Sequence, residues 1–135
     1  MTVPKGRILC TEDDEDTRDL IVFILSQNGF DVVCTDNVDD AINQARSQPF
    51  DLYLLDNWLA GSSGIGLTEK LREFDLKTPV LFYSGAAYDS DKEAARKSGA
   101  QGYLVKPARG DELLYEVIRL IAESKIVVPV KTATP

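Results

Sequence analysis

Apolar residues occur in two different patterns along this chain. Short apolar runs, rich in β-branched and aromatic residues, occur at five places, and each is followed by a longer stretch in which apolar residues recur every three or four positions. The short runs predict strands that are buried on both faces of a sheet, and the longer stretches predict amphipathic helices. The predicted strands are Arg7–Thr11, Asp31–Thr35, Asp51–Leu55, Val80–Tyr83 and Gly102–Val105.

The regular alternation of strands and helices determines the expected fold class. The helical patterns run over Thr17–Leu25, Val38–Ala45, Leu67–Phe74, Asp89–Lys97 and Leu113–Ile121. Gly29 and Gly99 stand where the first and fourth helices should end, because glycine tolerates the left-handed backbone of a helix C-terminus. Strands that alternate with helices favour right-handed crossovers and a parallel sheet. We therefore predict an α/β fold with a doubly wound, five-stranded parallel sheet.

The length of the chain fits one domain. With 135 residues, 44% of them hydrophobic, the chain is long enough to bury a core and too short for two domains of ordinary size. We predict a single domain over residues 1–124. Residues 125–135 contain Pro129 and end in Thr132–Pro135, which is typical of an extended or flexible C-terminal tail.

The net charge and the absence of a long apolar run limit the classes of molecule that the chain is expected to bind. Acidic residues outnumber basic ones by 22 to 15, giving a net charge of −7, which argues against direct binding of nucleic acid and favours attraction of a divalent cation. No apolar run approaches the roughly 20 residues that span a bilayer, and residues 1–6 lack the apolar core of a secretion signal. We expect a cytoplasmic protein without a membrane partner.

Two residue types exclude further classes of site. Cys10 and Cys34 lie inside apolar strand-like runs, so reduced, buried thiols are expected rather than a disulfide. The chain has no histidine, which excludes a serine-type catalytic triad, a histidine metal site and a phosphohistidine relay on this chain.

Charged and hydroxyl side chains follow four of the five predicted strands. Glu12, Asp13 and Asp14 come after the first strand, Asp56 after the third, Ser84 after the fourth and Lys106 after the fifth. In an open α/β sheet the carboxyl ends of the strands form the functional crevice, so we expect these side chains to meet.

This set of residue types suits phosphoryl transfer. Mg²⁺ prefers oxygen ligands, which Glu12, Asp13 and Asp56 supply. The carboxylate of Asp56 can also attack phosphorus and form an acyl phosphate. Lys106 can stabilise the charge that develops on the transferring group, and Ser84 can donate a hydrogen bond to it. Without a metal, the three acids should repel one another and raise the pKa of at least one of them.

Neighbouring residues receive other interpretations. Asp14, Glu15 and Asp16 are expected in the first turn of a helix, where the helix dipole favours acids. Trp58 should be partly exposed at the mouth of the site. The segment Gly61–Gly66 is glycine-rich but lacks the Gly-Lys-Ser/Thr ending of a phosphate-binding loop, so we interpret it as a flexible turn.

Four segments together resemble the receiver domain of response regulators in two-component signalling, of the single-domain type. The resemblance covers about Lys5–Glu123 and is carried by Arg7–Asp14, Asp51–Asp56, Pro79–Gly85 and Gly99–Pro107. It implies a flavodoxin-like (βα)5 fold with strand order 2-1-3-4-5. It also implies a phosphoacceptor rather than an enzyme, one that participates in its own phosphorylation and dephosphorylation.

The resemblance assigns roles to individual residues. Asp56 would accept the phosphoryl group, and Mg²⁺ would be held by Glu12, Asp13, Asp56 and the main-chain carbonyl of Trp58. Lys106 would bind the phosphoryl group, and its bond to Pro107 is expected to be cis. Ser84 and Tyr103 would be the switch residues.

The same resemblance implies partners. The phosphoryl group would come from a histidine kinase or a phosphotransfer protein. Output would pass to a downstream effector protein through the face of the fourth helix, the fifth strand and the fifth helix, and homodimerisation on phosphorylation stays open.

Three alternatives remain at this point. A phosphatase of the haloacid dehalogenase type also uses Asp, Lys and a hydroxyl, but its nucleophile begins an Asp-x-Asp arrangement after the first strand, where this chain has Glu12-x-Asp14. A flavodoxin-like binding module would need a hydroxyl-rich loop after the first strand to bind the flavin phosphate, and nothing after the first strand of this chain resembles such a loop. A receiver that acts without phosphorylation is disfavoured by the presence of Asp56 and Lys106.

Overall fold

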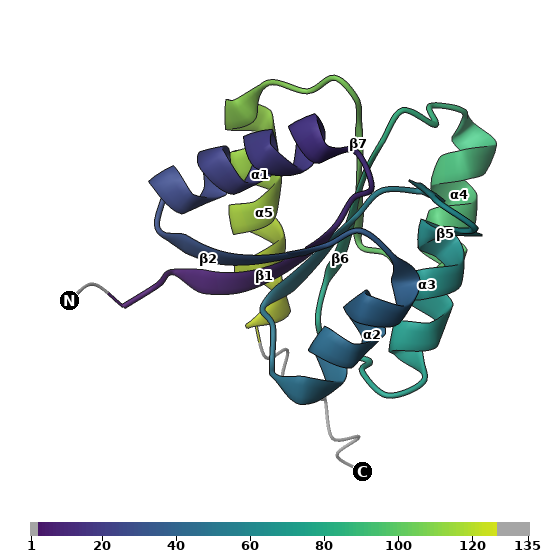
Figure 1. The fold of residues 1–135 in the computed structure, drawn as a ribbon, viewed down its shortest axis with the longest axis horizontal. Coiled ribbons are helices and arrows are strands. Elements are labelled where there is room, and N and C mark those ends of the chain that lie inside the picture. Colours follow the sequence, from purple (N-terminus) through teal and green to yellow (C-terminus); the bar gives the residue numbers. More distant parts are fainter. Residues whose placement is uncertain (1–2, 127–135) are drawn as a thin grey trace, which may run out of the picture.

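A five-stranded parallel sheet forms the centre of the described structure. The computed structural model describes residues 3–126, shown in Figure 1. The sheet order is β2-β1-β3-β6-β7. The strands are β1 (Gly6–Thr11), β2 (Phe30–Thr35), β3 (Leu52–Leu55), β6 (Val80–Ser84) and β7 (Gly102–Val105). Because β4 and β5 belong to a separate small hairpin, this order is the predicted 2-1-3-4-5 and confirms the predicted fold class.

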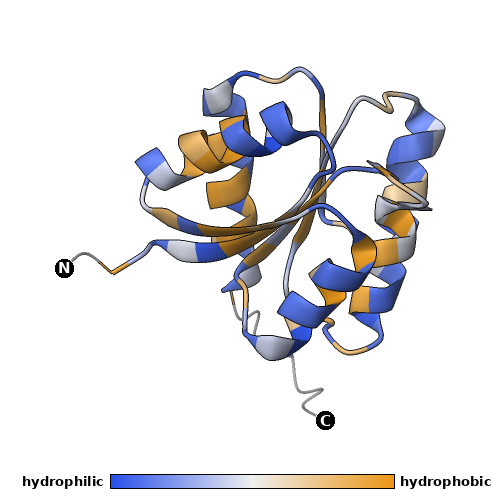
Figure 2. Cartoon of the chain, viewed as in Figure 1, coloured by the Kyte–Doolittle hydropathy of each residue, from blue (hydrophilic) through white to orange (hydrophobic). Residues whose placement is uncertain are grey.

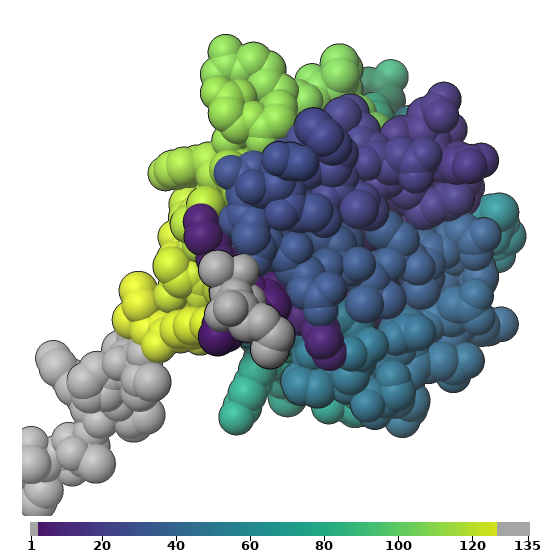
Figure 3. Space-filling view, turned by 60° about the vertical axis from the view of Figure 1, so that its left-hand side comes forward, coloured from purple at the N-terminus to yellow at the C-terminus, as the bar shows by residue number. Residues whose placement is uncertain are grey.

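Five helices cover the two faces of this sheet within residues 3–126. They are α1 (Glu15–Gln27), α2 (Val38–Ser47), α3 (Gly64–Arg72), α4 (Asp89–Ser98) and α5 (Gly110–Ser124). In Figure 1, α1 and α5 lie on one side of the sheet, and α2, α3 and α4 lie on the other. The space-filling view of Figure 3 agrees, because α1 and its neighbouring segments in blue lie beside α5 in yellow-green. None of these helices is both long and apolar enough to cross a membrane.

Each face of the sheet has its own apolar core. Side chains alternate along β1, so Ile8 and Cys10 pack with α1 and α5, whereas Leu9 packs with α2 and α3. The buried residues that the helices add include Leu25 and Val117 on the first face. In Figure 2 the orange, hydrophobic parts of the helices accordingly face the sheet and the blue parts face outward.

Side-chain caps explain where three of the helices begin. Asp14 accepts a hydrogen bond from the backbone N–H of Thr17 at 2.9 Å, as an N-cap of α1 should. Asn37 caps α2 and Ser63 caps α3 in the same way. At the other ends, Gly29 has a φ of 90° and Gly99 has a φ of 120°, and these conformations agree with the predicted helix ends.

The segment after Asp56 differs from the prediction. Residues 58–63 form a small antiparallel hairpin of β4 (Trp58–Leu59) and β5 (Ser62–Ser63), and α3 begins directly after it at Gly64. The interpretation of Gly61–Gly66 as one flexible turn was therefore wrong. Helix α3 begins inside this segment because Ser63 is its N-cap, with a side chain that accepts a hydrogen bond from the N–H of Gly66 at 3.0 Å.

The end of α5 lies near the predicted domain boundary. The helix ends at Ser124. Most of the tail predicted for residues 125–135, from residue 127 onward, lies outside the described residues.

Candidate functional site

Three carboxylates meet at the carboxyl edge of the sheet. Glu12 and Asp13 follow β1, Asp56 follows β3, and one oxygen from each lies within 4.8 Å of the others. Glu12 is 2% exposed and Asp56 is 6% exposed, whereas Asp13 faces solvent. The backbone N–H of Asp56 still donates to Thr11 O at 3.1 Å, so its position is set by the sheet itself.

Lys106 provides the positive charge of this cluster. Its Nζ donates to Glu12 Oε1 at 2.5 Å and to Asp56 Oδ2 at 3.1 Å. The backbone N–H of Lys106 donates to the carbonyl of Ser84 at 2.9 Å, which holds the start of the loop after β7 against β6. The peptide bond between Lys106 and Pro107 is cis, as the resemblance implied.

Burial and charge shift the pKa values in this cluster. Burial raises the pKa of Glu12 to about 7, and its contact with Asp56 adds to the rise, while the hydrogen bond from Lys106 opposes it. This confirms the expectation that at least one of the acids has a raised pKa. Burial lowers the pKa of Lys106, but the hydrogen bond to Glu12 and the charge of Asp56 outweigh it, so the net shift is upward.

Ser84 and Tyr103 contact the same short segment of the loop after β6. Ser84 is fully buried, and its Oγ accepts a hydrogen bond from the N–H of Ala86 at 3.2 Å. The hydroxyl of Tyr103 donates to the carbonyl of Ala86 at 2.6 Å. The ring of Tyr103 stacks on Phe82 with centroids 5.6 Å apart. A displacement of Ala86 would therefore affect both side chains.

Trp58 lies at the mouth of the site. Its side chain is 62% exposed, in agreement with the prediction, and its backbone N–H donates to Asp56 Oδ1 at 3.3 Å. A Cβ on Gly85 would lie 3.2 Å from the indole, so the ring packs over the beginning of the loop after Ser84.

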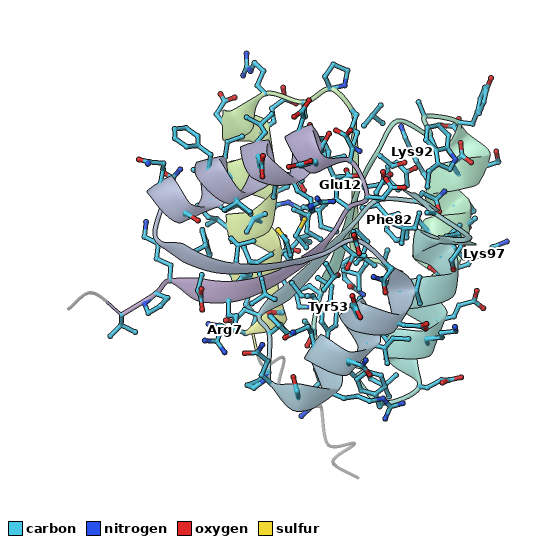
Figure 4. All side chains as sticks on the ribbon, in the orientation of Figure 1. Arg7, Glu12, Tyr53, Phe82, Lys92 and Lys97 are labelled. Atoms are coloured by element: carbon cyan, nitrogen blue, oxygen red, sulfur yellow. The ribbon has the colours of Figure 1, made fainter. Side chains whose placement is uncertain are left out.

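The site occupies one end of the sheet. In Figure 4, Glu12 and Phe82 lie in the interior near this end, and Arg7 and Tyr53 lie toward the opposite end. Lys92 and Lys97 lie out on α4.

The other acids after β1 serve the start of α1, with Glu15 and Asp16 in its first turn as predicted and Asp14 one position earlier, at the N-cap. Asp14 is the N-cap of α1, and its carboxylate also accepts from the hydroxyl of Thr17 at 2.6 Å. Glu15 and Asp16 lie in the first turn of α1. Asp14 is therefore engaged with the helix and does not belong to the carboxylate cluster.

The structure adds two residues that sequence reasoning missed. Arg18 donates from Nη1 to the backbone carbonyls of Glu12 at 3.0 Å and Asp13 at 3.2 Å, so α1 holds the acidic loop in place. The sequence did contain a signal for this contact, since Arg18 lies one turn into the helix that follows the acidic pair. Asn57 is buried, and its Oδ1 has no hydrogen-bond partner among the described residues; no pattern in the sequence indicated this.

Comparison with known proteins gives a consistent result. Residues 8–118 match the family described as the response regulator receiver domain. The chain is 32% identical over 119 residues to the cell cycle transcriptional regulator CtrA of Caulobacter vibrioides, covering 88% of this chain and 52% of CtrA. The chain thus spans about half the length of the curated relatives that it matches.

Solved structures resemble the chain over most of its length. The receiver domain of the Francisella response regulator 1452 superposes with a TM-score of 0.84 at 27% identity, covering 90% of this chain and all of that one. The receiver domain of the sensor histidine kinase PA1611 of Pseudomonas aeruginosa, solved with a magnesium ion coordinated in its active-site cleft, has a TM-score of 0.80 at 26% identity. This match covers 87% of this chain and 98% of that one.

Proposed function

The chain belongs to the response regulator receiver domain family, and from this premise we propose that it is a signalling switch that accepts a phosphoryl group on Asp56. The observation that carries the proposal is the contact of Lys106 with both Asp56 and Glu12. This contact joins the ends of β1, β3 and β7 around one carboxylate. Members of the family are phosphorylation-dependent switches and generally not enzymes.

The residues present suit Mg²⁺ as a cofactor. Glu12, Asp13 and Asp56 offer hard oxygen ligands close enough to share one ion, and the main-chain carbonyl of Trp58 is proposed as a further ligand. The magnesium ion reported for the PA1611 receiver domain supports this assignment. When bound, the ion would offset the charge of the acids and of the incoming phosphoryl oxygens.

Asp56 is proposed to act as the nucleophile toward a phosphorylated histidine of a kinase or phosphotransfer protein. One carboxylate oxygen attacks phosphorus, the new O–P bond forms and the N–P bond of the histidine breaks. Lys106 already donates to Asp56, so its ammonium group can donate to the phosphoryl oxygens with little movement. The same residues would assist the later hydrolysis, through which the domain takes part in its own dephosphorylation.

Ser84 and Tyr103 are proposed to transmit the conformational change that phosphorylation of Asp56 causes. Phosphorylation adds a charge of about −1.5 to −2 beside Ser84. If the Ser84 hydroxyl turns toward the phosphoryl group, it leaves the N–H of Ala86, and Tyr103 loses or shifts its own contact with Ala86. The change would then reach the face of α4, β7 and α5, where a downstream effector protein or a second copy of the domain would bind.

Replacement of the proposed acceptor provides the test. Asp56→Asn should abolish labelling by a phosphorylated phosphotransfer partner while the fold remains, because the amide cannot attack phosphorus. Asp36→Asn, which changes an exposed acid at the end of β2, should label like the native protein. Beryllofluoride with Mg²⁺ should change Trp58 fluorescence in the native protein and in Asp36→Asn but not in Asp56→Asn. Acid-stable labelling that persists in Asp56→Asn would overturn the proposal.

A further inference from the structure

The two cysteines are partners across neighbouring strands. Cys10 of β1 and Cys34 of β2 occupy the same position in the parallel register. Adjacent strands lie about 4.8 Å apart, which falls within the range of about 4.4 to 6.8 Å between the Cα atoms of a disulfide. Both cysteines are free thiols in the structure, as the sequence predicted. The prediction that both are buried was wrong for Cys34, which is partly exposed because β2 is an edge strand of the sheet.

Both thiols point to the same face of the sheet. Cys10 and Cys34 pack into the core under α1 and α5, whereas their chain neighbours Leu9 and Val33 pack into the core on the other face. Because they share a register position and a face of the sheet, the two side chains lie next to each other.

Only one of the two thiols is open to small solutes. Cys10 is fully buried, and Cys34 is partly exposed. Cys34 lines a pocket of about 390 Å³ whose other walls are polar and include Arg18, Thr35 and Asn43. A small, polar molecule that enters this pocket meets Cys34, whereas Cys10 is fully buried and does not line the pocket.

The accessible thiol is also acidified. Interaction with the Cys10 side chain lowers the pKa of Cys34 and the positive charge of Arg18 supports this shift, whereas burial and the negative charge of Asp19 oppose it. Because the thiolate is the nucleophile of cysteine chemistry, Cys34 should react first.

We propose that Cys34 and Cys10 form a peroxide-sensitive dithiol, in which Cys34 is oxidised first and Cys10 closes an intramolecular disulfide. The Cys34 thiolate attacks one oxygen of hydrogen peroxide, the O–O bond breaks, and the hydroxide takes up the thiol proton and leaves as water. The Cys10 sulfur then attacks the sulfenic acid at Cys34, the S–O bond breaks and a second water leaves. Two thiols lose two electrons in total, and one peroxide becomes two waters. A dithiol reductant reverses the reaction by exchange. This activity is independent of the proposed phosphoryl transfer.

Mass spectrometry of the full chain tests the proposal. After treatment with hydrogen peroxide and then N-ethylmaleimide, the native protein should lose the mass of two hydrogen atoms, take up no maleimide and yield a peptide that links Cys10 to Cys34. Dithiothreitol should restore both thiols. Before oxidation, a brief exposure to N-ethylmaleimide should modify Cys34 at least about tenfold faster than Cys10.

Two variants separate the roles of the thiols. In Cys34→Ser, Cys10 should remain a free thiol after the same peroxide treatment. In Cys10→Ala, the sulfenic acid at Cys34 should accumulate and be trapped by dimedone. If Cys10→Ala does not fold, the labelling rates of the native protein still decide the order of reaction. The proposal is overturned if both native thiols survive peroxide, if Cys10 reacts first, or if the disulfide joins two chains.

Discussion

At the scale of single residues, the site is a balance between two buried carboxylates and one ammonium group. Glu12 and Asp56 are both nearly inaccessible to water, and both accept from Lys106. One positive charge cannot offset two negative charges, and burial penalises each ionised carboxylate. Burial, together with the contact with Asp56, therefore raises the pKa of Glu12, and a divalent cation would oppose this rise.

The raised pKa of Glu12 predicts how stability depends on pH without metal. Because the pKa rises from 4.5 to about 7 on folding, the folded chain binds the proton more tightly than the unfolded chain. The contribution of Glu12 to stability is therefore complete below pH 4.5 and is lost as the pH rises through about 7. In chelator, this residue should lower the free energy of unfolding by about 1 to 2 kcal/mol across that window, after allowance for screening by water.

Urea unfolding at several pH values measures this effect, and Glu12→Gln is the matched control. The glutamine variant cannot titrate, so its stability should change less over the same window. Equal pH dependence in the two proteins would contradict the prediction.

Removal of the ammonium group of Lys106 should lower the stability of the metal-free protein. In Lys106→Met, Glu12 and Asp56 keep their buried positions without a cation, and the metal-free protein should lose about 2 to 4 kcal/mol of stability. Mg²⁺ should raise the melting temperature more in this variant than in the native protein, since the ion binds only the folded state. Lys97→Met on the exposed side of α4 should change stability by less than about 0.5 kcal/mol. A Mg²⁺ effect that is equal in all three proteins, measured by thermal melting, would sink the argument.

At the scale of elements, the backbone of Asp56 packs against the start of α3, which follows directly after the hairpin of β4 and β5. Gly64, the first residue of α3, lies so close to the backbone of Asp56 that an added Cβ would be 2.4 Å from its carbonyl oxygen and 2.9 Å from the ring of Phe82. The N–H of Gly64 donates to the carbonyl of Asn57 at 3.0 Å. The absence of a side chain at Gly64 is what allows the helix to begin against the acceptor strand.

Gly64→Ala should therefore be destabilising. Both contacts involve atoms that cannot move freely, so we expect a loss of about 2 to 3 kcal/mol in urea unfolding. Gly66→Ala, two residues later in the same helix, meets only side-chain hydroxyls, Ser63 Oγ at 3.3 Å and Ser62 Oγ at 3.8 Å, and should cost less than about 1 kcal/mol, because alanine favours the helix. Equal losses in the two variants would show that helix propensity, rather than the close approach, governs this turn.

At the scale of the whole molecule, two apolar cores share one sheet. Leu25 of α1 lies in one core and Leu67 of α3 in the other, and both are fully buried. The strands contribute alternate residues to both cores, so neither core can form without the sheet. The described residues should therefore unfold as one cooperative unit.

Truncation on either face tests this cooperativity. Leu25→Ala and Leu67→Ala should each lower the free energy of unfolding by about 2 to 5 kcal/mol, with a single transition in each case. Leu76→Ala, at a position that is 81% exposed, should have almost no effect. Circular dichroism and Trp58 fluorescence should give coincident curves; two separate transitions in either core variant would contradict the prediction.

The sequence by itself determined the main elements and which charged and hydroxyl side chains follow the strands at one edge of the sheet. Apolar runs such as Leu52–Leu55 predicted buried strands because a parallel sheet covered on both faces leaves no polar positions. Once the strands were known, the edge shared by Asp56, Ser84 and Lys106 followed, since parallel strands end on the same side. The hairpin of β4 and β5 escaped prediction because two-residue strands are too short to show a periodicity.

Only the tertiary structure decided how those residues meet. Lys106 lies 94 positions from Glu12 in the chain, and nothing local indicates that it would share its ammonium group between Glu12 and Asp56. The same holds for the contact of Tyr103 with Ala86 and for the pairing of Cys10 with Cys34. Local patterns reflect how each segment is buried, whereas distances between side chains depend on the register and packing of segments that are remote in the sequence.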